Sequence, residues 1–305
     1  MNGAAWIAVD WGTSNLRAWA IGADGAVLDV AASDDGMARL GPGDFEPALL
    51  RLVGPWLAEG RVTEALACGM VGARQGWTEA PYAAVPCPPL HPERFVRPAV
   101  ADPRLRLHIL PGLCQRTPWD VMRGEETQIA GFLAGEPDFD GVLCLPGTHS
   151  KWAHVGAGEV VSFTSFMTGE IFALLAKASV LRHSVADTGW SEPDFIEAVD
   201  ETLSRPERLA ARLFGLRAES LLADLAPERA RARLSGLLIG AELAATRPYW
   251  LGRDVVLIGA AGLAEAYRAA LAHCGLAARQ VAVAGLTLAG LAAAHSALAS
   301  TRSTP

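Results

Sequence analysis

Two short turns of this chain combine glycine with hydroxyl side chains, a composition that suits phosphate binding. The first turn is DWGTSN at residues 10–15, in which Gly12 lets the backbone approach a ligand closely. Hydroxyl, amide and backbone N–H groups in such a turn can donate hydrogen bonds to phosphate oxygens. The side chains that could do so here are those of Thr13, Ser14 and Asn15. The alternative is an ordinary hairpin turn that Asp10 caps.

A second turn of the same kind, PGTHSK at residues 146–151, also follows an apolar segment. Gly147 and Thr148 supply the same donors, so the two turns could grip one triphosphate from both sides and exclude water from it. Lys151, one of two lysines in the chain, could contact phosphate or sugar, or could be a solvated surface charge. His149 is either a hydrogen-bonded structural residue or a ligand contact.

Asp10 and a third glycine turn extend this chemistry to a metal and a nucleobase. A carboxylate has the wrong charge to touch phosphate directly, so we expect Asp10 to act on Mg²⁺ through a metal-bound water. In the third turn, IGAAG at residues 258–262, Gly259 and Ala261 would let a flat adenine ring lie on the backbone. This third turn is a weak signal by itself, since many helices start with small residues.

The two phosphate turns mark a repeat within the chain. Placing the first turn on the second aligns Ile7 with Val142. It also aligns Ala18 with Ala153, which predicts two copies of a strand–turn–strand–hairpin–strand unit. Helical patterns follow each copy, so the sequence indicates α/β domains with mixed sheets.

Local patterns predict the elements that position these turns. Asp24-Gly25 is a hairpin signal between two alternating apolar segments. The many prolines of residues 78–118 favour an irregular wall or lid. Predicted strands at the start of the chain are 6–12, 16–21 and 26–32. Predicted helices are 45–60 and 120–135, and the predicted domains are 1–138 and 139–305.

Composition excludes several functional classes. The 305 residues carry a formal charge of −7 without basic blocks, which argues against a nucleic-acid partner. Every long apolar stretch is interrupted before 18 residues, so we expect no membrane span. Residues 1–8 lack the basic start of a signal peptide, and the five cysteines form no CxxC spacing. We therefore expect a cytoplasmic protein with reduced cysteines.

The order of the motifs DWGT, PGT and GAAG resembles the sugar-kinase branch of the actin/hexokinase/Hsp70 ATPase superfamily. That branch has phosphate-1, phosphate-2 and adenosine motifs in the same order. More narrowly, five segments between residues 9 and 170 are similar to the 2-dehydro-3-deoxygalactonokinase family. They are DWGTSNLRAW, GMVGARQGW, PWDVMRGEETQIAGF, PGTHSKW and SFMTGE.

This resemblance implies a fold and an activity. The fold would be two ribonuclease-H-like (actin-like ATPase) domains, with mixed sheets flanked by helices and a cleft between the domains. The activity would be ATP- and Mg²⁺-dependent phosphorylation of 2-dehydro-3-deoxy-D-galactonate at its 6-hydroxyl, in galactonate catabolism.

The resemblance also implies a general base for the sugar hydroxyl. In glycerol-kinase-like enzymes an aspartate near a helix start has this role, and Glu125 takes its place here. Glu126 or Asp120 could serve instead. One member of the glutamate pair would then orient metal-bound water or form a salt bridge with Arg123. Both glutamates could also simply stabilise the helix dipole.

The segment GMVGARQGW resembles a sugar-contact loop in which an arginine and an acid bind hydroxyls. Arg74 falls on that arginine, while Gln75 replaces the acid. The missing negative charge suits a substrate that itself carries a carboxylate, which Arg74 could bind through two hydrogen bonds. Alternatively, Arg74 pairs with a surface carboxylate. Trp77 and Tyr82 are either pocket walls or core aromatics.

Other functions stay open from the sequence. The substrate could be another sugar acid or polyol, such as 2-dehydro-3-deoxy-D-gluconate, because the C4 epimer depends on the partners of one hydroxyl. A nucleotide-gated sugar-binding protein of the same fold is the second class, but a regulator would need a DNA-binding segment and a chaperone a peptide-binding domain. Apolar helix faces could serve the core or a homodimer interface.

Overall fold

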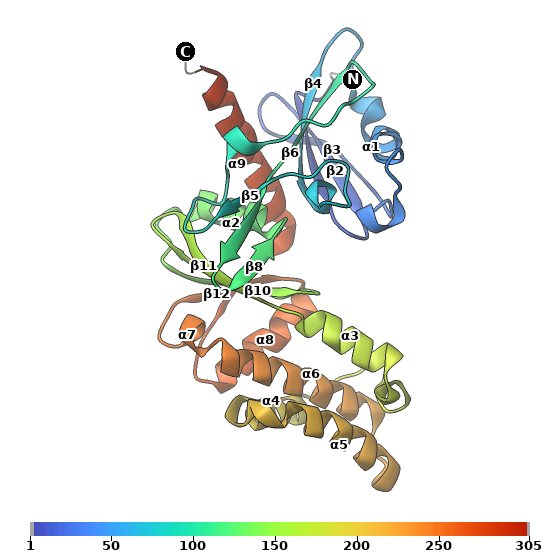
Figure 1. Cartoon of the computed structure of the whole chain (residues 1–305), viewed down its shortest axis with the longest axis vertical. Coiled ribbons are helices and arrows are strands. Elements are labelled where there is room, and N and C mark those ends of the chain that lie inside the picture. The colour runs from blue at the N-terminus through green and yellow to red at the C-terminus, as the bar shows by residue number, and fades with distance from the viewer. Residues whose placement is uncertain (1–2, 304–305) are drawn as a thin grey trace. The chain divides into compact units, whose positions relative to one another are not determined.

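The structure is a computed structural model that describes residues 3–303 (Figure 1). Met1 and Asn2, part of the segment expected to lack a signal peptide, lie outside the described residues. The chain divides into two compact units. Unit 1 comprises the residues up to Phe139, Gly156–Ser162 and the residues from Val283 onward; unit 2 comprises Asp140–Val155 and Phe163–Ala282.

Unit 1 is built on a five-stranded sheet with the order β3-β2-β1-β4-β6. β1, β2 and β3 form an antiparallel meander, whereas β4 and β6 run parallel to β1. The Asp24-Gly25 turn joins β2 to β3 as predicted, with Gly25 at φ 82°. The strands are β1 (Trp6–Trp11), β2 (Leu16–Ile21), β3 (Val27–Ser33), β4 (Thr63–Gly69) and β6 (Leu105–Ile109).

Both faces of β1 are buried because successive side chains point to opposite sides of the sheet. Ile7 and Val9 join a core cluster with helix α1 (Phe45–Val53). Trp6 and Ala8 face the other side and pack with helix α9 (Val283–Ser303).

Helices α9 and α2 (Glu125–Gly135) lie side by side in unit 1 (Figure 1). The contact depends on two glycines: a Cβ on Gly131 would lie 2.0 Å from the Leu286 carbonyl oxygen, and one on Gly290 would lie 1.9 Å from the Thr127 carbonyl oxygen. The sequence predicts a second domain that spans residues 139–305 and so contains α9. In the structure, α9 belongs to unit 1 instead.

The proline-rich segment contains a small sheet rather than only irregular structure. Its strands are β5 (Tyr82–Ala84), β7 (Gly112–Arg116) and β8 (Trp119–Met122), in the order β5-β7-β8. The predicted helix over 120–135 is wrong at its start, since Asp120 pairs with Gln115 in this sheet. The helix begins at Glu125, after Gly124 turns the chain at φ 104°.

The predicted helix over 45–60 also ends early. α1 stops at Val53, because Pro55 lacks the N–H that an α-helix needs and the chain continues as a 3₁₀ turn. The 3₁₀ segments of the chain are η1 (Met37–Arg39), η2 (Gly54–Trp56), η3 (Met70–Gly72), η4 (Pro92–Arg94), η5 (Val180–His183) and η6 (Pro206–Arg208).

Unit 2 contains a sheet with the order β11-β10-β9-β12-β13. β9 and β10 are antiparallel, and β12 runs parallel to both β9 and β13. Cys87 donates its backbone N–H to the Val160 carbonyl at 3.2 Å, which places the tip of the β10–β11 hairpin in unit 1. The strands are β9 (Gly141–Leu145), β10 (Ser150–Gly156), β11 (Glu159–Phe166), β12 (Val255–Gly259) and β13 (Arg279–Ala282).

Helices α4 and α6 make the tightest helical contact of unit 2 (Figure 1). A Cβ on Gly236 would lie 2.3 Å from the Phe195 carbonyl oxygen, and one on Gly240 would lie 2.3 Å from that of Val199. The helices are α3 (Thr168–Ala178), α4 (Glu192–Ser204), α5 (Leu209–Leu222), α6 (Pro227–Ala245), α7 (Arg247–Trp250) and α8 (Ala261–His273).

The two large sheets have the same strand order and direction, so the predicted repeat exists. Its alignment is nevertheless wrong by one residue after the turn. Val9 faces Ala18, and its counterpart Cys144 faces Trp152 rather than Ala153. The connection between β9 and β10 is therefore one residue shorter than that between β1 and β2. An antiparallel meander extended by parallel strands, twice over, is the ribonuclease-H-like topology of actin-like ATPases.

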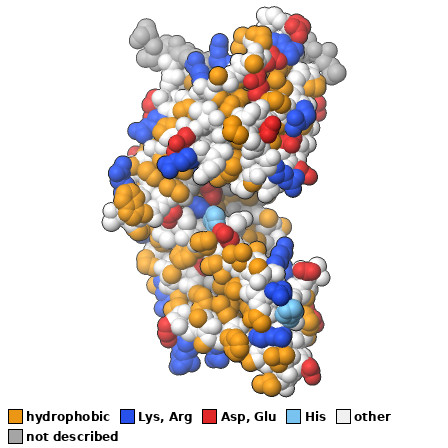
Figure 2. Space-filling model, turned by 45° about the vertical axis from the view of Figure 1, so that its right-hand side comes forward, with side chains coloured by type: hydrophobic (Ala, Val, Ile, Leu, Met, Phe, Trp, Pro, Cys, Tyr) orange, Lys and Arg blue, Asp and Glu red, His pale blue; other side chains and the backbone are white. Residues whose placement is uncertain are grey.

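Surface and helix composition bear on two expectations. In Figure 2, Lys and Arg side chains are interspersed with Asp and Glu side chains on the visible face, without a large patch of one charge. None of the described helices combines the length and apolar character that crossing a membrane requires.

Candidate active site

The phosphate-1 turn connects β1 to β2 in unit 1. Gly12 donates its N–H to the Asn15 carbonyl at 2.9 Å, and Thr13, Ser14 and Asn15 are exposed. From behind, Met37 donates its N–H to the Gly12 carbonyl at 3.0 Å. Among the described residues the backbone N–H groups of Thr13 and Ser14 have no acceptor. The turn therefore presents N–H groups and polar side chains to a ligand, while the Gly12 and Thr13 carbonyls accept hydrogen bonds from the segment that follows β3.

Gly36 is the residue that permits this packing. A Cβ on Gly36 would lie 2.2 Å from the Ser14 carbonyl carbon and 2.4 Å from the Thr13 carbonyl oxygen. Real Cβ atoms do not approach backbone so closely, so any side chain at this position must displace the turn.

The phosphate-2 turn connects β9 to β10 in unit 2, and the start of α3 supports it in the same way. Glu170 donates its N–H to the Thr148 carbonyl at 2.9 Å. A Cβ on Gly169 would lie 2.3 Å from the Gly147 carbonyl oxygen. Within the described part of the chain, the N–H groups of Gly147 and Thr148 have no acceptor. Each unit thus contains one such turn, supported by a glycine from the segment that follows the meander.

Two polar residues of the second turn have defined environments. His149 Nε2 lies 2.5 Å from Glu170 Oε2, at the start of α3. Lys151 is only 4% exposed, and its Nζ donates to the His149 carbonyl at 3.4 Å. The alternative of a solvated surface charge for Lys151 is therefore wrong, and its ammonium group lies beneath the turn.

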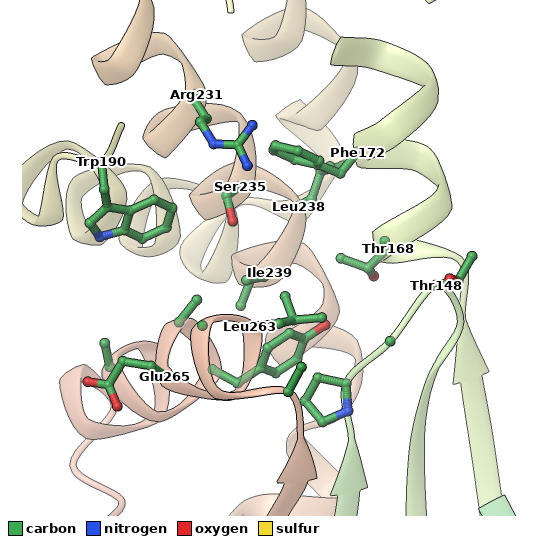
Figure 3. A pocket seen from close by; sticks show the side chains of 18 of the residues that line it. Thr148, Thr168, Phe172, Trp190, Arg231, Ser235, Leu238, Ile239, Leu263 and Glu265 are labelled. Atoms are coloured by element: carbon green, nitrogen blue, oxygen red, sulfur yellow. The ribbon is translucent and has the colours of Figure 1, made fainter. Parts of the chain in front are cut away.

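The third glycine turn lies beside the second and shares a pocket with it. A Cβ on Gly259 would lie 3.3 Å from Pro146 Cδ, and helix α8 begins at Ala261. The pocket has a volume of about 1010 Å³ and lies within unit 2 (Figure 3). Residues Pro146, Gly147 and Thr148 of the second turn and Ala260 and Gly262 after β12 line it. This volume is in the range of small-molecule and cofactor sites.

The two ends of the pocket differ chemically. One end holds the Thr148 hydroxyl (Figure 3) and the backbone N–H groups of Gly147 and Thr148, which have no acceptor among the described residues. At the other end, the Trp190 ring lies 4.8 Å from that of Phe195, and the Arg231 guanidinium lies 5.1 Å from the Phe172 ring centroid. A donor-rich end and an end with planar side chains suit the phosphates and the base of a nucleotide. The sequence offers no signal for this second end, because its residues come from two helices and the loop before α4 and form no motif.

The predicted acidic pair lies at the first turn of α2 in unit 1. Glu126 is 1% exposed and accepts hydrogen bonds from the Gly124 N–H at 2.6 Å and the Thr127 hydroxyl at 2.9 Å. Glu125 is only partly buried, and its Oε2 accepts the Arg123 N–H at 3.1 Å. Glu125 is thus the more exposed member of the pair, whereas Glu126 is buried and bonded within the first turn of α2.

The environment of Arg123 differs from the one expected. Its guanidinium donates to the Ala80 carbonyl at 2.8 Å and lies 4.4 Å from the Tyr82 ring centroid. The alternative of a salt bridge between one of the two glutamates and Arg123 is therefore wrong. Asp120, the other candidate base, lies on β8.

Asp10 is a largely buried carboxylate at the end of β1. Burial raises its pKa, and the charge of Arg17 partly opposes this. Its Oδ1 lies 4.0 Å from the Cys68 thiol, and burial together with the charges of Asp10 and Glu126 raises the pKa of that thiol. Both carboxylates therefore border the same cysteine. Among the described residues, no group of three or more His, Cys, Asp or Glu side chains is placed to bind a metal by itself.

The residues of the sugar-contact loop follow β4. The Arg74 side chain is 81% exposed, with Nε 3.4 Å from Glu79 Oε1, and Gln75 is also exposed. Trp77 packs into the core of unit 1, with its ring 6.2 Å from Phe45 and 6.1 Å from Trp11. Of the two aromatic roles considered for Trp77, the structure places it in the core.

The buried pair on α2 gives a pH-dependent prediction. Burial and the neighbouring charge of Glu125 raise the pKa of Glu126 from 4.5 to about 7. Between these pH values the folded state holds the Glu126 proton more tightly than the unfolded chain does. The protonated carboxyl therefore contributes to the free energy of unfolding at low pH, and this contribution is lost as the pH rises through about 7. The Glu126→Gln side chain cannot ionise. As the pH rises from about 4.5 to about 7, we expect the free energy of unfolding of Glu126→Gln to fall less than that of the wild type, with a difference of about 3 kcal/mol at most.

Urea denaturation of both proteins from about pH 5 to about pH 8.5 measures this difference. Glu59→Gln, at a side chain that is 87% exposed, is the control and should follow the wild type. Parallel stability curves for the wild type and Glu126→Gln would contradict the prediction.

Two repeated ribonuclease-H-like units, each with a glycine turn between its first two strands, define a protein of the actin-like ATPase fold. The particular family follows from comparison with known proteins: the family model for 2-keto-3-deoxy-galactonokinase matches residues 10–294. The chain belongs to this family.

Individual relatives agree with this assignment. A protein of Rhizobium meliloti (strain 1021) assigned as a 2-dehydro-3-deoxygalactonokinase is 40% identical over 297 residues, which cover 95% of this chain and 96% of the relative. The 2-dehydro-3-deoxygalactonokinase of Escherichia coli (strain K12) is 34% identical over 276 residues, or 89% of this chain and 91% of the relative. A crystal structure from Sinorhizobium meliloti, assigned to the same activity, superposes with a TM-score of 0.86 at 40% identity, covering 96% of this chain and 99% of that one.

Proposed function

We propose that this protein transfers the γ-phosphoryl group of ATP to the 6-hydroxyl of 2-dehydro-3-deoxy-D-galactonate, in the cytoplasm. The pocket that the phosphate-2 turn shares with the turn after β12 is the observation that supports this most. Its donor-rich end suits the phosphates, and its planar end near Trp190 suits adenine. The names of the full-length relatives supply the substrate.

The proposal assigns the nucleotide to unit 2 and the acceptor sugar and the base to unit 1. Glu125 takes the proton of the 6-hydroxyl as the oxygen attacks the γ-phosphorus, and the bond to the β-phosphate oxygen breaks to release ADP. The N–H groups of Gly147 and Thr148 hold the phosphates of the nucleotide in the pocket of unit 2. No covalent bond to the protein forms, so the rate depends on positioning and on charge stabilisation.

Mg²⁺ is the metal that this fold class implies, and the donors of unit 1 fit it. Asp10 supplies one carboxylate on β1, next to the phosphate-1 turn. Mg²⁺ prefers oxygen ligands and is usually held by one or two carboxylates together with phosphates and waters. Asp10 would hold it through a bound water, and the ion would neutralise charge on the phosphates.

Arg74 is our candidate for recognising the substrate carboxylate. Its guanidinium is exposed and only 3.4 Å from Glu79, so an incoming carboxylate can compete with that surface pair. We expect Arg74→Ala to raise the KM for the sugar acid by about 10-fold or more while the KM for ATP stays constant, since a hydrogen bond to a charged group contributes roughly 1.5–3 kcal/mol. Steady-state kinetics with each substrate varied in turn measures this.

Glu79→Gln is the matched control for Arg74→Ala. It removes the competing carboxylate and leaves the guanidinium, so the KM for the sugar acid should stay the same or fall. An unchanged KM in Arg74→Ala would place Arg74 outside the binding site.

The function itself is tested with a substrate panel. Purified protein is incubated with ATP, Mg²⁺ and each of several 2-dehydro-3-deoxy sugar acids, including the galactonate and gluconate derivatives, and ADP is measured. We expect ADP release that depends on the galactonate derivative and a product phosphorylated at the 6-position. Equal ADP release with no acid present would exclude the kinase activity, and preference for the gluconate derivative would correct the substrate.

A further inference from the structure

A single buried carboxylate joins the walls of the nucleotide pocket. Glu242 lies on α6 and is 2% exposed. Its two oxygens accept hydrogen bonds from the Ser150 hydroxyl at 2.9 and 3.0 Å, the Trp152 indole N–H at 2.7 Å and the Tyr267 hydroxyl at 2.8 Å. The Thr168 hydroxyl donates to it as well.

The donors come from the segments that form the pocket. Ser150 and Trp152 belong to β10, directly after the phosphate-2 turn. Thr168 is the first residue of α3, whose start packs against that turn, and Tyr267 lies on α8; both also line the pocket. A shift of any of these three segments would therefore break a hydrogen bond to Glu242.

The chemistry of the cluster requires an acceptor at this position. A carboxylate has about four acceptor sites and no donor, and four side chains donate to Glu242 here. Burial raises the pKa of Glu242, and the four hydrogen bonds oppose that rise by favouring the ionised form. The Trp152 indole N–H can only donate a hydrogen bond. Because Trp152 is 0% exposed, water cannot accept that bond and a protein acceptor is required. The proton of Thr168 is directed to Glu242, so towards the pocket this hydroxyl can only accept. Hydrogen bonds to a charged acceptor are about twice as strong as neutral ones.

We propose that Glu242 is a positioning residue for ATP: its carboxylate holds the phosphate-2 turn, the start of α3 and helix α8 in the arrangement that binds the nucleotide. The inference rests on the proposed function, because it assumes that this pocket binds ATP. Glu242 itself does not line the pocket, so it acts through Ser150, Thr168 and Tyr267.

The first test is the isosteric variant Glu242→Gln in the full chain. Its amide has one acceptor oxygen and an NH₂ group that faces donors, so part of the cluster loses its partner. We expect the Kd for ATP, measured by calorimetry, to rise by about 10- to 100-fold, which corresponds to losing 1.5–3 kcal/mol. The KM for the sugar acid should stay constant. A raised Kd for ATP together with an unchanged KM for the sugar acid would not result from a general loss of folded protein. The control is Glu219→Gln, at a glutamate of α5 that is paired with Arg233 of α6, which should bind ATP like the wild type.

A second variant keeps the inference testable if Glu242→Gln does not fold. Ser150→Ala removes one buried donor that does not line the pocket, and we expect it to raise the Kd for ATP several-fold while the KM for the sugar acid stays constant. Its thermal midpoint should fall modestly, because a buried hydrogen bond is lost. Combined with Glu242→Gln, it should add little, since both changes act on the same hydrogen bond.

Folded Glu242→Gln or Ser150→Ala with wild-type affinity for ATP would overturn the inference. This outcome differs from failure of the proposed function: wild-type protein that does not bind ATP would reject that function, whereas wild-type binding with unaffected variants would reject only the role of Glu242.

Discussion

Glu125→Gln is expected to lower kcat by about 10²- to 10⁴-fold at saturating ATP and sugar acid, the usual contribution of a general base. The amide keeps the shape of the side chain but cannot accept the proton of the 6-hydroxyl. Because Glu125 is only partly buried and lies at the start of α2, its carboxylate can reach a substrate. The Kd for ATP should stay the same, since the proposed nucleotide pocket lies in unit 2.

The neighbouring glutamate is the control that distinguishes a base from a structural residue. Glu126 is 1% exposed and bonded to the Gly124 N–H and the Thr127 hydroxyl, so Glu126→Gln should affect kcat much less. Pre-steady-state measurement of the phosphoryl-transfer step separates chemistry from product release. Full activity in Glu125→Gln together with loss of activity in Glu126→Gln would move the base by one residue.

Gly169→Ala is expected to raise the KM for ATP by about 10-fold or more. The added Cβ would lie 2.3 Å from the Gly147 carbonyl oxygen and 3.0 Å from Thr148 Cα. Both contacts are to backbone, so the start of α3 or the phosphate-2 turn must move, and overpacking of this kind costs about 1–3 kcal/mol. In Gly36→Ala the Cβ would meet Ser14 in the same way, and the phosphate-1 turn should be displaced.

Matched glycines show whether the effect comes from these contacts. A Cβ on Gly215, in helix α5, or on Gly43, before α1, would meet nothing within 4 Å. Gly215→Ala and Gly43→Ala should therefore keep wild-type kinetics, while thermal midpoints report any general loss of stability. Unchanged kinetics in folded Gly169→Ala would mean that the phosphate-2 turn does not position ATP.

Much of unit 1 could be predicted because its signals are local. The alternation of Ile7 and Val9 with Trp6 and Ala8 predicts a strand, and the contacts of these residues with α1 and α9 explain why all four are apolar. The turn at Asp24-Gly25 was likewise predicted correctly, since a type of turn that needs positive φ selects glycine. The glycine turns after β1, β9 and β12 are also local signals, because each is a short run of small and polar residues directly after an apolar segment.

Other features depend on partners far away in the chain. The strand containing Asp120 was mistaken for the start of a helix, because its pairing with Gln115 leaves no periodic signal in a segment rich in proline. The exposure that separates Glu125 from Glu126 is also tertiary: two adjacent identical residues differ only in what packs against them. The roles assigned to the site residues stay predictions for the experiments above.

The sequence by itself determined the repeated strand–turn units, the order of the three glycine turns and the acidic pair at a helix start, since a few neighbouring residues specify each of them. The tertiary structure decided which glutamate is accessible, that Lys151 is buried and that α9 packs with unit 1. It also decided that Glu242 of α6 meets Ser150, Trp152, Thr168 and Tyr267. Those residues lie between 25 and 92 positions away in the chain, so only the packing of α6 against the sheet and its neighbouring helices brings them together.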